Sequence, residues 1–164
     1  WVGFLVTLGA GVLIVTEHLF AAGFVVLVAG FFDILDGALA RSTNRVTRFG
    51  AVLDSTLDRL AEAVILIALL VVYARVPAVA EVALVSATLI GSQLVSYVRA
   101  RAEGLGLQCE VGIFTRAERV VVLALGLLLS QFDYVLIIAL SIILVFSYVT
   151  VGQRLFRVWQ QTKN

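Results

Sequence analysis

The sequence predicts an all-α integral membrane protein, with six transmembrane helices around a polar cavity on the cytoplasmic side. Of its 164 residues, 62% are hydrophobic, whereas a soluble domain is typically about 45–50% apolar. Lipid has to cover that excess. The hydrophobic residues gather into six runs, each near the length of about 17–25 residues that crosses a bilayer as a helix. The runs do not alternate with polar residues, so helices are favoured over the strands of a barrel.

The six runs are separated by short segments that carry most of the charged residues. We expect helices over residues 1–16, 20–41, 50–73, 82–102, 117–131 and 134–156. No internal repeat stands out, so we expect a single domain over residues 1–164. Because the sequence starts inside an apolar run and contains no methionine, we expect an N-terminal segment to precede it.

The distribution of charge predicts how the helices are oriented. Most of the 12 basic residues lie at one set of helix ends. By the positive-inside rule these ends, and both termini, face the cytoplasm, which places the protein in the cell membrane. The net charge of +1 gives no indication of a nucleic-acid partner. A single cysteine, Cys109, excludes an intrachain disulfide and a zinc site built on several cysteines.

Four aspartates lie in the second and third predicted helices, toward the cytoplasmic ends: Asp33, Asp36, Asp54 and Asp58. An aspartate at the centre of a membrane helix costs about 2.5–3.5 kcal/mol. Four ionised carboxylates close together also require compensating positive charge. Each pair lies on one helix face, and the short connection should bring all four carboxylates together. Such a cluster suits Mg²⁺ or Mn²⁺, and two ions could hold a phosphate and its leaving group.

Two structural interpretations of this segment remain open. The aspartates could form ion pairs with Arg41, Arg45 and Arg59, and the small residues Gly37 and Gly50 could serve helix packing. Glu62 lies one turn beyond Asp58, where we expect it to tune Asp58 or to contact Arg59.

The spacing of these residues carries a resemblance. The segment reads Asp33-x2-Asp36-Gly37-x2-Ala40-Arg41-x8-Gly50-x3-Asp54-x3-Asp58. It resembles the complete motif of the CDP-alcohol phosphotransferase family, and the likeness extends to six spans. The resemblance implies a divalent-metal enzyme that moves the phosphatidyl group of a CDP-linked lipid, such as CDP-diacylglycerol, to an alcohol and releases CMP. It also suggests a homodimer.

The resemblance assigns roles to the matching positions. The metal ligands would be Asp33, Asp36 and Asp54. Asp58 would be the general base and would also reach the second metal. The residues that receive the cytidine and its diphosphate would be Gly37, Ala40, Arg41 and Gly50.

The acceptor is indicated by arginines in the second half of the chain. Arginine binds phosphate through paired N–H groups, and Arg99, Arg101 and Arg119 lie at the cytoplasmic helix ends, with Arg154 as a weaker fourth candidate. The segment from Ser96 to Glu103, followed by Glu118-Arg119, resembles the branch that uses inositol phosphate. The sequence departs from that branch in having arginine at position 99, where lysine is frequent, and alanine at position 117, where proline is frequent.

Several alternatives stay open. The arginines could be topology markers that bind lipid head groups. The same basic pocket could accept glycerol 3-phosphate, as in phosphatidylglycerol-phosphate synthesis. Intramembrane acids can also mark a cation transporter, although the repeats and interrupted helices typical of one are not seen. A catalytically inactive scaffold is disfavoured because all four aspartates are present.

Overall fold

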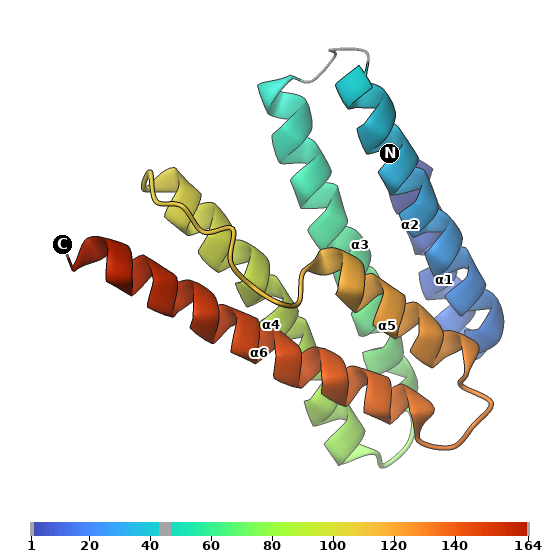
Figure 1. Ribbon diagram of the computed structural model, residues 1–164. Helices are drawn as coiled ribbons and strands as arrows, with labels where there is room; N and C mark the ends of the chain where they lie inside the picture. Colours follow the sequence, from blue (N-terminus) through green and yellow to red (C-terminus); the bar gives the residue numbers. More distant parts are fainter. Residues whose placement is uncertain (1, 43–46, 164) are drawn as a thin grey trace.

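The chain folds into six helices, as seen in a computed structural model that describes residues 2–163 except 43–46, and the side chains of 2–163 except 33–46 (Figure 1). In chain order the helices are α1 (Val2–Val15), α2 (Leu19–Ser42), α3 (Arg48–Ala74), α4 (Val79–Gly104), α5 (Arg116–Leu128) and α6 (Val135–Thr162). No strand occurs in the part of the chain that is described. The predicted all-α class is thus confirmed, although α6 continues past the expected end at residue 156.

Only part of the predicted membrane topology follows from helix length and composition. Among the described residues, α4 and α6 are long and apolar enough to cross a bilayer, whereas α1 and Leu19–Phe32 are shorter apolar helices. Large hydrophobic side chains on the outside of the bundle, such as Phe20, Phe24 and Ile138, are more than half exposed.

The helices pack in a chain of neighbours. Helix α1 packs against α2 and α3, α5 packs against α2 and α6, and α4 packs against α3 and α6. Two glycines make close approaches possible, because a Cβ at Gly23 would lie 2.8 Å from the backbone nitrogen of Leu128, and one at Gly126 would lie 2.7 Å from the Ala139 Cβ. Small residues commonly allow membrane helices to approach in this way.

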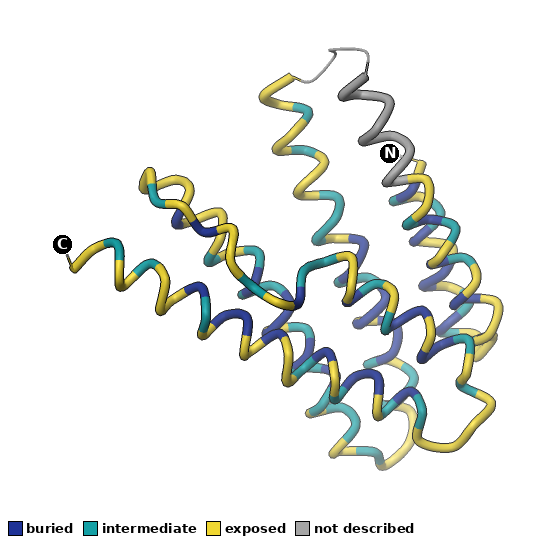
Figure 2. Tube along the Cα trace, viewed as in Figure 1, coloured by how far each residue is buried: buried dark blue, intermediate teal, exposed yellow. Residues whose placement is uncertain are grey.

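The apolar core lies where the helices cross. Its fully buried members include Ile14, Leu66, Leu69, Leu127 and Leu140. Figure 2 shows buried residues concentrated in this crossing region, whereas the start of α3 and the ends of α4 and α6 are mainly exposed. We call this second region, which contains the first turns of α3 and α5 and the last turns of α4 and α6, the site end of the bundle.

Local hydrogen bonds fix where α3 and α5 begin. The hydroxyl of Thr47 accepts a bond from the Gly50 amide at 3.0 Å, which caps α3. At α5, the Thr115 amide donates to Glu118 Oε2 at 2.8 Å, and the Thr115 hydroxyl donates to the same carboxylate. The start of a helix leaves backbone N–H groups without partners inside the helix. Both caps supply hydrogen-bond partners at these positions. They hold in place the two helix starts that carry the charged residues described next.

Candidate active site

Asp54 and Asp58 lie one turn apart in the first half of α3. Asp54 is exposed, and the Asp58 side chain is 26% exposed. Two carboxylates on successive turns near an open helix end supply the oxygen ligands that a hard divalent cation prefers. Among the described side chains, no three histidine, cysteine, aspartate or glutamate residues form a metal-binding group.

The other half of the predicted aspartate cluster lies on α2. The backbone at Asp33, Asp36, Gly37, Ala40 and Arg41 is helical, and their side chains lie outside the described set. The convergence of four carboxylates therefore stays a prediction. Gly50 lies in the first turn of α3, where the one described atom within 4 Å of an added Cβ is the Thr47 hydroxyl oxygen, at 2.9 Å.

Asp58 has an arginine partner on α5. Its Oδ1 lies 2.9 Å from Nη1 of Arg116, whose side chain is 30% exposed. Arg116 was not among the predicted site residues. The available signal was its spacing: Arg116 and Arg119 share one face of α5, just as Asp58 and Glu62 share one face of α3.

A second arginine–carboxylate pair lies one turn deeper between the same helices. Arg119 Nε donates to Glu62 Oε1 at 2.6 Å and Arg119 Nη2 donates to Oε2 at 3.0 Å, with side chains only 1% and 4% exposed. The expectation that Glu62 contacts Arg59 is wrong. The Arg59 guanidinium turns back to donate to the Ser55 carbonyl on its own helix, whereas Glu62 faces the interior and α5.

Arg154 is also buried and is held by backbone carbonyls. It is 3% exposed; its Nε donates to the Val111 carbonyl at 2.9 Å and its Nη1 donates to the Val95 carbonyl. These bonds connect α6 to α4 and to the segment between α4 and α5. The amide of Gln161 adds a second connection, because it exchanges two hydrogen bonds with the backbone of Gln108, at 2.7 and 3.1 Å.

The remaining predicted arginines are at the end of α4. Arg99 is exposed and pairs with Glu103 at 2.8 Å, and Arg101 is exposed in the last helical turn. The positive charges of Arg99 and Arg119 both act on the Arg154 guanidinium. Helices α4, α5 and α6 thus each contribute one arginine to a charged region, formed by Arg99, Arg119 and Arg154, in which Glu103 pairs with Arg99 and Glu62 pairs with Arg119.

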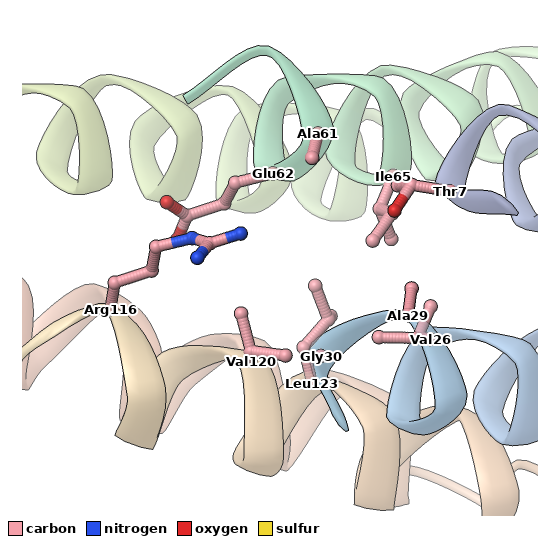
Figure 3. A pocket seen from close by; sticks show the side chains of 10 residues that line it. All are labelled: Thr7, Val26, Ala29, Gly30, Ala61, Glu62, Ile65, Arg116, Val120 and Leu123. Carbon is pink, nitrogen blue, oxygen red and sulfur yellow. The ribbon is translucent and has the colours of Figure 1, made fainter. Parts of the chain in front are cut away.

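A small cavity lies beside these pairs, between α1, α2, α3 and α5. Its volume is 20 Å³, on a scale where one water needs about 10–15 Å³. Glu62 and Arg116 are the charged residues in its lining, and Figure 3 shows their side chains pointing toward one another. The rest of the lining is mainly apolar. A volume of 20 Å³ is too small to hold a nucleotide.

Comparison with known proteins decides the family. The family described as CDP-alcohol phosphatidyltransferase matches residues 2–153. The chain belongs to this family. Family membership confirms the predicted reaction class, a CDP-alcohol phosphatidyltransferase, and overturns the transporter alternative.

Named relatives lie within the same family. An archaetidylinositol phosphate synthase of Methanothermobacter thermautotrophicus is 38% identical over 165 residues, which cover 98% of this chain and 81% of the relative. A phosphatidylinositol phosphate synthase of Mycobacteroides abscessus is 41% identical over 149 residues, which cover 87% and 67%.

Solved structures of a Mycobacterium tuberculosis phosphatidylinositol phosphate synthase have the same fold. The complex with manganese and citrate has a TM-score of 0.89 at 34% identity, covering 96% of this chain and 79% of that one. The complex with CDP-DAG has a TM-score of 0.86 at 34% identity, covering 96% and 83%. The phosphatidyltransferase fold therefore extends over almost the whole of this chain.

Proposed function

We propose that this phosphatidyltransferase joins inositol 1-phosphate to the lipid phosphate of a CDP-linked lipid and releases CMP. The observation that carries the acceptor is the charged region of Arg99, Arg119 and Arg154, which gathers three guanidinium groups from three helices. Such a region suits an alcohol that itself carries a phosphate. The names of the relatives, which make phosphatidylinositol phosphate or archaetidylinositol phosphate, support the same acceptor.

The transfer needs a base, a leaving group and charge neutralisation. A hydroxyl of the acceptor forms a bond to the lipid-side phosphorus, and the bond from that phosphorus to CMP breaks. We assign Asp58 as the base that takes the hydroxyl proton. Its partner Arg116 lies 2.9 Å away and holds the carboxylate in place between α3 and α5.

The metal ligands in this proposal are Asp33, Asp36, Asp54 and Asp58. Divalent cations held there, two Mg²⁺ or Mn²⁺ per site, would neutralise the diphosphate and stabilise the departing CMP. The cytidine diphosphate would be received by Gly37, Ala40, Arg41 and Gly50. Support comes from the complete spacing of the motif in the sequence and from the manganese complex of the mycobacterial relative.

The acceptor phosphate would be bound by Arg99, Arg101 and Arg119, with the buried Arg154 as a fourth member. Arg99 and Arg101 are exposed, so both are accessible to a soluble substrate. Arg154 already donates to two backbone carbonyls, so we expect it to contribute mainly charge and to hold the surrounding backbone.

We further propose that all six helices span the cell membrane and that the site end faces the cytoplasm. A lipid donor needs its acyl or isoprenoid chains in the bilayer while its head group enters a polar site. The basic residues at the site end agree with a cytoplasmic side. A homodimer is the assembly we expect from the family resemblance.

The experiment is CMP release by purified protein with Mg²⁺ or Mn²⁺. CDP-diacylglycerol and CDP-archaeol serve as donors, and inositol 1-phosphate, free inositol, glycerol 3-phosphate and serine serve as acceptors. We expect release with inositol 1-phosphate alone, and the donor that supports it identifies the lipid class. Stimulation by glycerol 3-phosphate instead would keep the reaction class and replace the acceptor.

A further inference from the structure

Glu62 is a buried glutamate that has no role in the reaction proposed above. Both of its carboxylate oxygens accept from Arg119, at 2.6 Å from Nε and 3.0 Å from Nη2. Two parallel N–H···O bonds of this kind fix the plane of a guanidinium as well as its position. Glu62 therefore determines the direction in which the rest of the Arg119 guanidinium points.

The part of the guanidinium that Glu62 does not engage is Nη1. This nitrogen is buried, and no described atom accepts a hydrogen bond from it. A buried N–H without an acceptor is costly and uncommon in native structures. Arg119 also acts electrostatically on Arg154, so an anionic oxygen is the acceptor that this nitrogen favours.

Glu62 also sets the position of Arg119 Nη1 relative to Asp58, the proposed base on the same helix. Glu62 and Asp58 lie four residues apart, about 6 Å along the axis, and their arginine partners Arg119 and Arg116 lie on successive turns of α5. The two pairs thus keep α3 and α5 in register. Holding Arg119 on Glu62 fixes the distance between a phosphate anchor and the base.

We propose that Glu62 is a positioning residue for the acceptor: it holds Arg119 so that Nη1 donates to the acceptor phosphate at a fixed offset from Asp58. Glu62 itself contacts neither substrate nor metal in this arrangement. A purely stabilising role explains the pair less well, because buried ion pairs often contribute little net stability relative to apolar residues. The inference rests on the proposed function, since it requires an acceptor with a phosphate.

The test is Glu62→Gln in the full chain, assayed with Mg²⁺ and with each substrate varied in turn. Glutamine keeps the size of the side chain and loses the charge and one acceptor oxygen. We expect the KM for inositol 1-phosphate to rise about tenfold or more, as for a lost bond to a charged group. The KM for the CDP-lipid should stay within about twofold, and inorganic phosphate should become a correspondingly weaker competitor of the acceptor.

Glu17→Gln is the matched control, because Glu17 pairs with Arg75 at the opposite ends of the helices, at 3.7 Å and with both side chains exposed. It should leave both KM values unchanged. Glu62→Asp keeps the charge and shortens the side chain, so it carries the test if Glu62→Gln fails to fold. Its acceptor KM should lie between those of the wild type and Glu62→Gln.

An unchanged acceptor KM, or equal increases in both KM values, would overturn the positioning role. The proposed function is checked separately in the wild type, which fails it if inositol 1-phosphate does not stimulate CMP release. In that event inorganic phosphate binding, measured by calorimetry on the wild type and Glu62→Gln, still decides the inference. Weaker binding to the variant supports it, and equal binding, or no binding to the wild type, contradicts it.

Discussion

The crossing region and the site end of the bundle are held together by different forces. In the crossing region, apolar side chains such as Leu66, Leu69 and Leu140 are at most 1% exposed, and glycines allow the helices to touch. At the site end, α5 reaches α3 through long arginine side chains that pair with carboxylates. The outer of these pairs is about one quarter to one third exposed, at 26% and 30%, and the inner pair is almost completely buried.

This difference indicates that the two ends of the same helices have different roles, one in stability and the other in substrate binding. Packing in the crossing region holds the helices together. At the site end, charged groups such as Asp54 and Arg101 are exposed, whereas the inner pair of Glu62 and Arg119 is buried and marks the boundary. Substitutions on the two sides of this boundary should therefore separate activity from stability.

The largest effect is expected at Asp58, on the site side. Asp58→Asn removes the proposed base, and kcat should fall by a factor of about 10²–10⁴. The Tm in detergent should change little, because this side chain is partly exposed, and binding of the CDP-lipid should persist. Full activity in this variant would show that another group takes the proton.

Arg119, at the boundary, should affect both properties. Arg119→Met leaves Glu62 buried without its partner, a change that costs about 3–5 kcal/mol for a buried pair. We expect a clear drop in Tm together with a higher acceptor KM. A drop in Tm with an unchanged acceptor KM would assign Arg119 to structure alone.

Leu66, in the crossing region, should affect stability only. It is 1% exposed, and Leu66→Ala should cost about 2–5 kcal/mol through lost packing. Leu60→Ala is the matched control, because Leu60 lies on the same helix and is 48% exposed. Both variants should keep wild-type KM values below their Tm, and a raised acceptor KM in Leu66→Ala would show that the two regions are coupled.

Gly112 should give the smallest effect, at the site end. Its φ is +135°, and a Cβ there would lie 2.6 Å from Thr150 Cγ2 and 3.3 Å from Arg154 Nε. Gly112→Ala should cost about 1–3 kcal/mol and raise the acceptor KM by displacing Arg154. Gly104→Ala, where no described atom lies within 4 Å of the added Cβ, is the control that should behave like the wild type.

The helices could be predicted from the sequence because their boundaries follow directly from apolar runs and the charged breaks between them. The reaction class could also be predicted, because the residues that carry the family motif, from Asp33 to Asp58, lie in one short segment of the chain. The roles of the individual aspartates remain predictions, since the side chains of Asp33 and Asp36 lie outside the described set.

The pairing of charges could not be predicted in the same way. One of the two expectations for Glu62, a contact with Arg59 three positions earlier on the same helix, is wrong, because Glu62 pairs with Arg119 on α5. Such a choice depends on how α3 and α5 are rotated and spaced, which tertiary packing decides. The partner of Asp58, Arg116, was missed for the same reason. Arg154 was assigned to the acceptor, while its contacts with backbone carbonyls depend on the path of the segment between α4 and α5.

The proposed reaction requires an acceptor that carries a phosphate, and the structure of the lipid product shows whether it does. Wild-type protein would be incubated with CDP-lipid, Mg²⁺, and equal amounts of inositol 1-phosphate and free inositol, and the extracted lipid examined by ³¹P NMR. We predict a product with one phosphodiester and one phosphomonoester phosphorus, the monoester being the phosphate that the acceptor brought. A product with only a diester phosphorus would contradict the claim, because it would mean that the arginines at the site end do not select a phosphorylated acceptor.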